Sequence, residues 1–320
     1  MSINILRTAD AWWVSGPDGT AVPIDTTAST TAEILADRDS VEAAAAQIDD
    51  ATGASARTSV SDLQLISPVT APCRVVAQMT NYVSHVTDSG MNPDTVPLTF
   101  FRKASGSISG PHDDIVSPSH VRFLDYEVEL GLVIGRTLEV GTRVDDSNWY
   151  AYVAGFVLTN DVSARDVQLP QTQFYEAKSY PTFTPTGPAL VLLDADELDA
   201  FPDLRLQLKV NGETRQDSTG ADMIYSPAQA LAALSRFQKL EPGDLILTGT
   251  PGGTALKAPP KPIEIIGSLM PTALKWKSFF KSQAKNKKYL HDGDFVEASI
   301  STPDGSIDLG SQVCVVRKPR

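Results

Sequence analysis

Three carboxylates interrupt a stretch of the chain that otherwise has the composition of a buried strand. They are Asp125, Glu127 and Glu129, and the stretch runs from Phe123 to Gly135. Alternate residues of a strand lie on one face, so these three side chains should share a face. Neighbouring carboxylates that lose contact with water repel one another and need a compensating cation. The stretch therefore predicts a site for a hard metal ion, with an edge strand that exposes an acidic face to solvent as the alternative.

A further candidate ligand, Asp161, follows an apolar stretch that ends at Leu158. Just beyond it, Ser163 and Asp166 have the spacing of a helix capping box, which would give Asp166 a structural role. Asp161 has no such explanation, so we expect it to be the third metal carboxylate. Arg165 would face either the site or a salt bridge.

The predicted ligand set of Glu127, Glu129 and Asp161 contains only oxygen donors. Such a set suits Mg²⁺, Mn²⁺ or Ca²⁺ better than zinc, and water would complete the coordination shell. The sequence therefore predicts a divalent cation as cofactor.

His85 and Asp88 are three residues apart, so they would meet on one helical turn. A carboxylate beside an imidazole raises its pKa and orients it, as a general base for a water molecule requires. We therefore consider a catalytic dyad, with a surface histidine beside an acidic neighbour as the alternative.

Two loops carry groups that suit a substrate with carbonyl or carboxylate oxygens. Lys178 is the one lysine of the proline-punctuated segment 176–188, and Gly249 and Thr250 belong to the glycine-rich segment 248–253. Glycines allow backbone N–H groups to approach an anion closely. The spacing of a nucleotide-binding phosphate loop is absent, which argues against a nucleotide ligand.

The overall composition excludes several classes of protein. The chain has 320 residues, 42% of them hydrophobic, and a formal net charge of −12, which argues against a nucleic-acid partner. Its two cysteines, Cys73 and Cys314, lie far apart in apolar runs, so no disulfide is expected. There is no secretory signal and no run of about 18 apolar residues, so we expect a cytoplasmic protein.

Short apolar strands dominate the pattern and predict the α+β class, mainly β. Residues 1–66 read as a small N-terminal domain, with a hairpin around the turn at residues 16–19 and a helix from about Thr31 to Asp49. Residues 67–320 read as the catalytic domain. Its expected strands lie at residues 75–77, 98–101, 126–134, 152–158, 189–193, 204–210, 245–247, 295–300 and 313–316.

Five stretches in this order resemble the fumarylacetoacetate hydrolase family: NYVSH, DYEVELGLVIG, NDVSARDVQ, AKSYPTFTPTGP and LEPGDLILTGTPGG, between residues 81 and 253. The resemblance implies a β-sandwich or β-roll catalytic domain, a small N-terminal domain and a homodimer. It also implies that Glu127, Glu129 and Asp161 bind a divalent ion, usually Mg²⁺, Mn²⁺ or Ca²⁺, and suggests aromatic catabolism as the setting.

The same resemblance implies roles for residues around the metal. His85 would belong to a mobile segment that closes over the substrate, supported by an acidic partner. Substrate oxygens would be held by Lys178, Arg165, Gln168, Gly249 and Thr250, and by one of the neighbours Arg102 and Lys103, between which the sequence does not choose.

The chain departs from the family pattern at two positions near the predicted site. Many smaller members have Glu where this chain has Asp88, which leaves the geometry of the dyad open. True fumarylacetoacetases have a fourth metal carboxylate ahead of the histidine, and none occurs here between Leu63 and Ser84. This favours the acylpyruvase, fumarylpyruvase and decarboxylase branch of the family.

A basic insertion from about residue 255 to 291 is the largest departure. It carries eight lysines and a possible apolar helical stripe, which consists of Leu269, Leu274, Trp276, Phe279 and Phe280. The insertion would pack against the catalytic domain or a dimer partner, cover the site and shape substrate choice, or bind a membrane surface.

From these features we predict a metal-dependent hydrolase that cleaves a carbon–carbon bond of a small β-diketo acid resembling an acylpyruvate. His85 would activate water, and an enolate would leave. The alternative within enzymes is a decarboxylase or a tautomerase of a 2-oxo acid such as oxaloacetate or a hydroxymuconate. A non-catalytic protein that binds lipid or a partner through the insertion would not need the metal-site residues.

Overall fold

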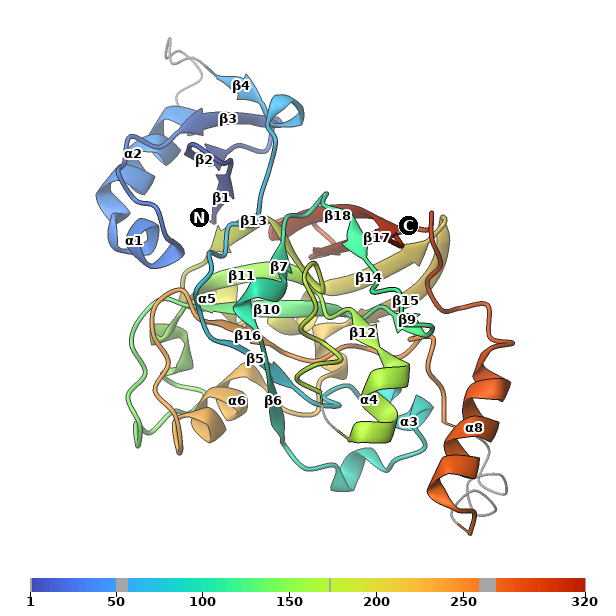
Figure 1. Cartoon of the computed structure of the whole chain (residues 1–320). Helices are drawn as coiled ribbons and strands as arrows, with labels where there is room; N and C mark the ends of the chain where they lie inside the picture. The colour runs from blue at the N-terminus through green and yellow to red at the C-terminus, as the bar shows by residue number, and fades with distance from the viewer. Residues whose placement is uncertain (1, 50–56, 173, 259–268, 320) are drawn as a thin grey trace.

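Two β-sheets packed face to face form the centre of the molecule (Figure 1). The computed structural model describes residues 2–49, 57–172, 174–258 and 269–319. The strands of the large sheet are, in spatial order, β4 (Thr58–Ser59), β3 (Thr20–Pro23), β2 (Trp12–Ser15), β1 (Ile3–Arg7), β13 (Thr184–Leu192), β11 (Val153–Asn160), β10 (Val128–Ile134), β16 (Leu245–Leu247), β5 (Val75–Gln78) and β6 (Phe100–Lys103), with β7 (Ile108–Ser109) paired to β13.

The second sheet packs on the central strands of the first. Its strands are, in order, β15 (Glu213–Thr219), β14 (Arg205–Val210), β17 (Phe295–Ser301), β18 (Asp308–Arg317) and β8 (Ile115–Val116). A separate short pair joins β9 (Leu124–Asp125) to β12 (Ser163–Ala164). The α-helices are α1 (Thr31–Ala36), α2 (Arg38–Asp49), α3 (Val83–Asp88), α4 (Arg165–Gln171), α5 (Ala195–Leu198), α6 (Pro227–Leu234) and α8 (Thr272–Gln283). The predicted α+β class, mainly β, is confirmed.

The core lies between the two sheets because the central strands are apolar on that side. Every residue of β10 is buried. Leu130 and Leu132 of β10 share a core cluster with Leu208 of β14 and Ile300 of β17. This continuous burial makes a carboxylate such as Glu129 costly within β10 unless it has compensating partners.

The N-terminal strands extend the large sheet, because β1 pairs antiparallel with β13. The predicted hairpin is present as β2 and β3. The predicted helix 31–49 is instead two helices, since α1 ends at Asp37, whose side chain accepts a hydrogen bond from Thr26 Oγ1 at 2.5 Å. The domain boundary at residue 66 stays a prediction.

Within the basic insertion, the apolar stripe is only partly formed. Trp276, Phe279 and Phe280 are half-buried on one side of α8, whereas Leu269 and Leu274 are exposed. Lys261 and Glu264 lie outside the described residues. None of the helices in the described parts of the chain is long and apolar enough to cross a membrane.

Candidate metal and substrate site

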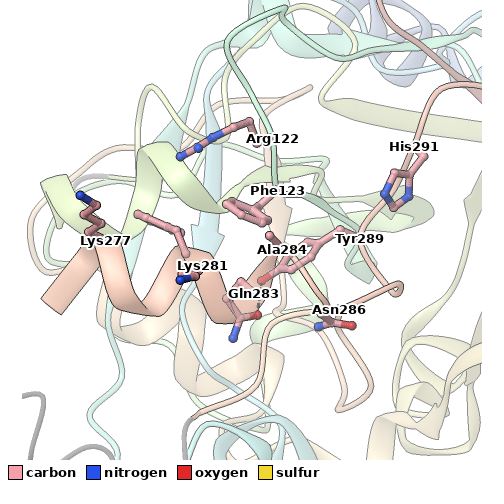
Figure 2. A pocket seen from close by; sticks show the side chains of 10 residues that line it. Arg122, Phe123, Lys277, Lys281, Gln283, Ala284, Asn286, Tyr289 and His291 are labelled. Carbon is pink, nitrogen blue, oxygen red and sulfur yellow. Dashed lines mark hydrogen bonds between the residues drawn. The ribbon is translucent and has the colours of Figure 1, made fainter. Parts of the chain in front are cut away.

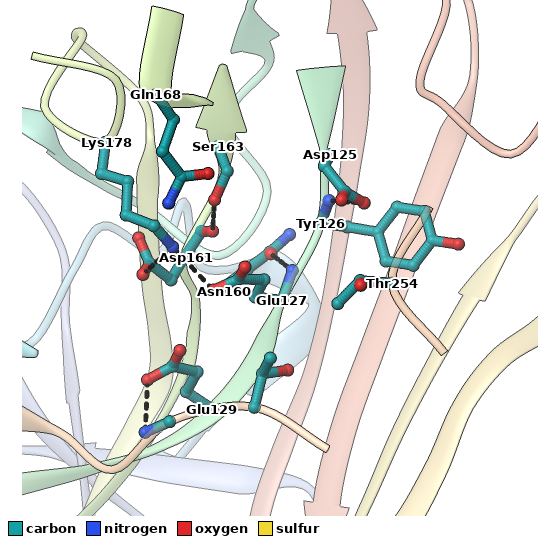
Figure 3. A network of polar contacts seen from close by, with 12 residues as sticks. Asp125, Tyr126, Glu127, Glu129, Asn160, Asp161, Ser163, Gln168, Lys178 and Thr254 are labelled. Atoms are coloured by element: carbon teal, nitrogen blue, oxygen red, sulfur yellow. Dashed lines mark hydrogen bonds and ion pairs between the residues drawn. The ribbon is translucent and has the colours of Figure 1, made fainter. Parts of the chain in front are cut away.

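The three predicted metal carboxylates lie together at neighbouring strand ends (Figure 3). One oxygen from each of Glu127, Glu129 and Asp161 lies within 4.8 Å of the others, and all three side chains are buried. β10 and β11 are antiparallel, with Glu129 opposite Thr159, so Glu127 before β10 meets Asp161 after β11. The N–H of Asp161 donates to the carbonyl of Glu127 at 2.8 Å. Backbone pairing therefore places the triad.

Asp125 lies outside this group, although simple alternation would place it on the same face. The strand is interrupted, since β9 ends at Asp125 and β10 begins at Val128. The Asp125 carboxylate instead accepts hydrogen bonds from the N–H groups of Ala255 at 2.8 Å and Leu256 at 3.1 Å, and from Arg165 Nε at 2.8 Å. Asp125 thus anchors the start of the insertion beside the site.

Buried cations compensate the carboxylates. Lys178 Nζ lies 2.7 Å from Glu127 Oε2 and 2.5 Å from Asp161 Oδ2. Lys103 Nζ pairs with Asp161 and donates to the carbonyl of Phe183 at 2.9 Å. The guanidinium of Arg165 reaches both Asp125 and Glu127, so Arg165 faces the site and forms salt bridges there.

The charge balance leaves room for a divalent cation. The buried charged side chains at this site are four carboxylates and three cations, namely Asp125, Glu127, Glu129 and Asp161 with Lys103, Lys178 and Arg165. Full ionisation of these seven groups gives one net negative charge, and the exposed Lys257 and Lys275 also line the cavity. An added divalent ion would make the centre positive and favour an anionic substrate. The all-oxygen triad fits a hard ion, so the buried triad can hold a divalent metal.

The carboxylates of the triad differ in their electrostatic surroundings. Burial raises the pKa of Glu129 well above its ordinary value, and the negative charges of Asp161 and Glu127 add to this. Burial also acts to raise the pKa of Glu127, but Lys178 and Arg165 outweigh it, and the net shift is downward. Glu129 accepts a hydrogen bond from the N–H of Gly249 at 2.8 Å. An added cation would therefore stabilise the ionised form of Glu129 more than that of Glu127.

His85 and Asp88, the predicted dyad, face different partners. The His85 ring lines the same cavity as Glu127 and Glu129, and its buried Nδ1 has no hydrogen-bond partner among the residues that the structure describes. Asp88 accepts a hydrogen bond from the N–H of Gly253 at 3.1 Å and lies 3.3 Å from Lys257 Nζ. Burial lowers the pKa of His85, so the ring is neutral at pH 7. The dyad itself stays a prediction.

The cavity has a volume of about 740 Å³. Among the predicted site residues, its lining includes His85, Glu127, Glu129, Arg165, Gln168, Lys178, Gly249 and Thr250. Gln168 accepts a hydrogen bond from Arg165 Nη1 at 2.8 Å, and Thr250 Oγ1 donates to the Val128 carbonyl at 2.9 Å. The sequence therefore identified part of the polar lining.

The structure distinguishes Lys103 from its neighbour Arg102, which the sequence alone could not do. Lys103 is buried against Asp161, whereas Arg102 is exposed on the other face of β6. Their roles in substrate binding stay predictions.

The predicted capping box at Ser163 and Asp166 is wrong. The N-cap of α4 is Ala164, with no side-chain cap. Ser163 Oγ donates to the Asp161 carbonyl at 2.9 Å, and Asp166 instead accepts from the N–H of Arg122 at 3.0 Å. The short β9–β12 pairing turns Ser163 away from the helix start.

Sequence reasoning missed Gln78, which ends β5 and lines the cavity. Gln78 is only 2% exposed, yet neither Oε1 nor Nε2 has a hydrogen-bond partner among the described residues. An unpaired buried amide is costly unless a ligand pairs with it. The available signal was an amide side chain that ends an apolar run just before the NYVSH stretch.

The amino-acid sequence of the chain is similar to a known protein family and to several characterised proteins. Residues 74–317 match the family model described as the C-terminal domain of fumarylacetoacetate (FAA) hydrolase. A mitochondrial oxaloacetate tautomerase of Rattus norvegicus is 38% identical over 203 residues, which cover 62% of this chain and 63% of that protein. A 2,4-didehydro-3-deoxy-L-rhamnonate hydrolase of Sphingomonas sp. (strain SKA58) is 36% identical over 230 residues, 71% of this chain and 79% of that protein. The match thus spans less than two thirds of the tautomerase.

Solved structures resemble the whole chain. A probable 2-hydroxyhepta-2,4-diene-1,7-dioate isomerase from Mycobacterium abscessus has a TM-score of 0.75 and 30% identity, with complete coverage of both chains. A fumarylacetoacetate hydrolase from Exiguobacterium antarcticum has a TM-score of 0.72 and 27% identity, covering 99% of this chain and all of the other. The similarity therefore includes the N-terminal strands as well as the metal-site region.

Proposed function

Because the chain belongs to the fumarylacetoacetate hydrolase family, we propose that it is a divalent-metal-dependent enzyme that hydrolyses a carbon–carbon bond in an acylpyruvate-like acid. The observation that carries this proposal is the buried triad of Glu127, Glu129 and Asp161, which lies beside Lys178 and shares its cavity with His85. An anionic 2-oxo acid suits a site that a divalent ion would make net positive.

A divalent ion held by Glu127, Glu129 and Asp161 would supply Lewis-acid polarisation of the oxygens of the 2-oxo acid. Lys178 brings a buried ammonium group to the same place, and it can stabilise negative charge that develops on an enolate oxygen. Gln168 and the backbone of Gly249 border the space in which substrate oxygens would lie.

His85 supplies the proton acceptor. Its neutral ring can take a proton from a water molecule, whose oxygen attacks the distal carbonyl. The bond between that carbonyl carbon and the neighbouring methylene then breaks, and its electrons form the enolate of pyruvate. A proton returned to the enolate completes the reaction, which yields a carboxylic acid and pyruvate.

Tautomerisation of a 2-oxo acid is the second candidate. It is favoured by the position of Asp88, whose carboxylate contacts Gly253 and Lys257. Moving a proton between carbon and enol oxygen needs no attacking water, so this reaction depends less than hydrolysis on a His85 ring that Asp88 does not orient. The names of the tautomerase and isomerase relatives support this candidate as much as the hydrolase names support the first.

A panel of acylpyruvates and oxaloacetate separates the two reactions when wild-type protein is compared with His85→Ala. Hydrolysis should fall by about 10²–10⁴-fold in the variant, the usual contribution of a general base. Tautomerisation that depends mainly on the metal should fall by less than about tenfold. Both should disappear after complete removal of metal with EDTA and return with Mg²⁺ or Mn²⁺, and undiminished turnover without metal would contradict the proposal. The homodimer and the preference for Mg²⁺ also stay predictions.

A further inference from the structure

The lining of the cavity combines polar groups with a set of apolar side chains. Glu127, Glu129, Lys178 and Gln168 are among the polar ones, and α8 adds Lys275, Ser278, Ser282 and Gln283. The apolar side chains come from separate segments and include Met91, Phe101, Leu169, Phe174, Trp276 and Phe279. Phe101 and Phe174 contact each other, with ring centroids 5.2 Å apart, and Lys178 Nζ lies 5.2 Å from the centroid of the Phe101 ring. A ligand that fills the cavity therefore meets both charged groups and apolar rings.

The size of the cavity exceeds the needs of a four-carbon acid. About 740 Å³ lies within the range of roughly 300–1,000 Å³ that is usual for sites of drug-sized ligands. A small acid bound at the triad would leave apolar side chains of the lining in contact with water. Burial of apolar ligand surface there would add affinity.

The lining of the cavity is built partly by α8, from the basic insertion, and α8 is fastened to the catalytic domain. Figure 2 shows the region where α8 approaches Phe123 and Tyr289. Phe280 of α8 stacks on Phe123, with centroids 5.3 Å apart. Tyr289 donates its hydroxyl to Gln283 Oε1 at 2.9 Å, closing the end of the helix against the segment that follows.

This anchoring fixes which side of α8 faces the substrate. Phe280 points to the catalytic domain, while Trp276 and Phe279 line the cavity. The rings of Trp276 and Phe279 contact each other edge to face, with centroids 5.8 Å apart. The start of the insertion is held as well, because Asn286 Nδ2 donates to the Ala255 carbonyl at 2.7 Å and Asp125 binds the Ala255 N–H.

We propose that α8 is a specificity element and that Trp276 and Phe279 select 2-oxo acids that carry an extended apolar tail. This inference rests on the proposed function for the identity of the polar end of the ligand. The oxo acid binds at the triad, and the tail extends between α8 and the wall formed by Phe101 and Phe174. Each buried methylene group should strengthen binding by about fourfold.

Binding of non-reactive oxo-acid mimics tests the inference apart from turnover. Calorimetry with Mg²⁺-loaded protein would compare oxamate with N-hexyloxamate, which adds an apolar tail to the same polar end. The tail should tighten binding to wild-type protein by at least about tenfold. In Trp276→Ala/Phe279→Ala this gain should fall to about threefold or less, while oxamate binds as before.

Controls distinguish loss of the wall from loss of the fold. Phe237→Ala removes an aromatic side chain that is 63% exposed and does not line the cavity, so the tail should keep its full effect. In the single variant Trp276→Ala, Phe280 loses the stacked ring of Trp276 but keeps its contacts with Phe123 and Phe279. This variant should give an intermediate loss of the tail effect, and unchanged binding of oxamate would show that the polar site is intact. If N-hexyloxamate binds wild-type protein no more tightly than oxamate, including the case in which neither binds, the inference is wrong.

Activity separates this inference from the proposed function. A series of straight-chain acylpyruvates should show kcat/KM rising with acyl length in wild-type protein and nearly constant in the double variant. If no acylpyruvate is turned over but the tail still tightens binding through Trp276 and Phe279, the proposed reaction is wrong and the specificity element stands. If acylpyruvates are hydrolysed with a kcat/KM that does not depend on acyl length, the proposed reaction stands and the specificity element is wrong.

Discussion

The Nζ atom of Lys178 lies 2.7 Å from Oε2 of Glu127, and both side chains are buried. The same ammonium group is 2.5 Å from Asp161, so one lysine links two carboxylates that follow different strands. This link holds two members of the triad together at the junction of β10 and β11.

Lys178→Met should destabilise metal-free protein by about 3–5 kcal/mol, because the change leaves buried carboxylates without a partner. Urea unfolding with EDTA present measures this loss. Added Mn²⁺ should restore part of it by supplying positive charge. Lys209→Met, which alters an exposed lysine of β14, is the matched control and should change stability little. A loss below about 1 kcal/mol in Lys178→Met would show that the pairing contributes little.

Asp125→Asn should lower the free energy of unfolding by more than it lowers the free energy of Mn²⁺ binding. The variant loses the charge that pairs with Arg165, at a cost of about 1.5–3 kcal/mol. Its Mn²⁺ affinity should fall by no more than about tenfold. Glu129→Gln should lower that affinity by more than about 100-fold, beyond the range typical of residues that only support a ligand. Calorimetric titration of both variants tests the assignment, and the reverse order would place Asp125 among the ligands.

Metal binding should strengthen as pH rises through the raised pKa of Glu129, because below that pKa the metal-free site holds a proton. The folded metal-free protein binds more protons than the unfolded chain, so its stability should fall as pH rises through the raised pKa of Glu129. A divalent ion that binds at the triad replaces the proton on Glu129. The increase in melting temperature on adding Mn²⁺ should therefore grow with pH, accompanied by proton release in calorimetry in two buffers. A pH-independent increase would contradict the assignment of Glu129 as the proton carrier.

Gln78→Leu should lower kcat/KM by about 5–10-fold, the effect of one or two hydrogen bonds to substrate, while stability stays constant or rises. The reason is that the Gln78 amide is buried and has no partner in the described part of the chain. Gln216→Leu is the contrasting variant, since Gln216 Nε2 donates to Thr250 Oγ1 at 2.8 Å and its Oε1 accepts from the Val128 N–H at 2.9 Å. It should be destabilised by about 1–3 kcal/mol. If both variants lose the same amount in melting temperature, Gln78 has a structural role and not a role in substrate binding.

Much of the fold could be read from local pattern. Apolar runs located β10 and β11, since a strand buried on both faces must be apolar almost throughout. The strand β15 was missed because its residues Glu213–Thr219 are mostly polar and it becomes a strand by pairing with β14 at the sheet edge. The order of strands in the sheet could not be predicted either, because it includes pairs such as β16 and β5, which are parallel neighbours but far apart in sequence.

The sequence by itself determined which chemical groups the site contains. Carboxylates at Glu127, Glu129 and Asp161 follow from residue type and from their places at the ends of apolar runs, and such spacing predicts an oxygen-ligand metal site without coordinates. Local rules suffice for this because alternation and strand ends are properties of a few consecutive residues.

Only the tertiary structure decided how these groups are divided among roles. In the folded chain, Asp125 accepts a hydrogen bond from the start of the insertion, and Lys103 rather than Arg102 pairs with Asp161. Asp88 accepts a hydrogen bond from Gly253. The tertiary structure also laid α8 along the cavity through the contact of Phe280 with Phe123. Each of these contacts joins residues that are distant in sequence or depends on where a strand is interrupted. Side-chain pairing across such distances is set by packing of the whole chain, which no local pattern encodes.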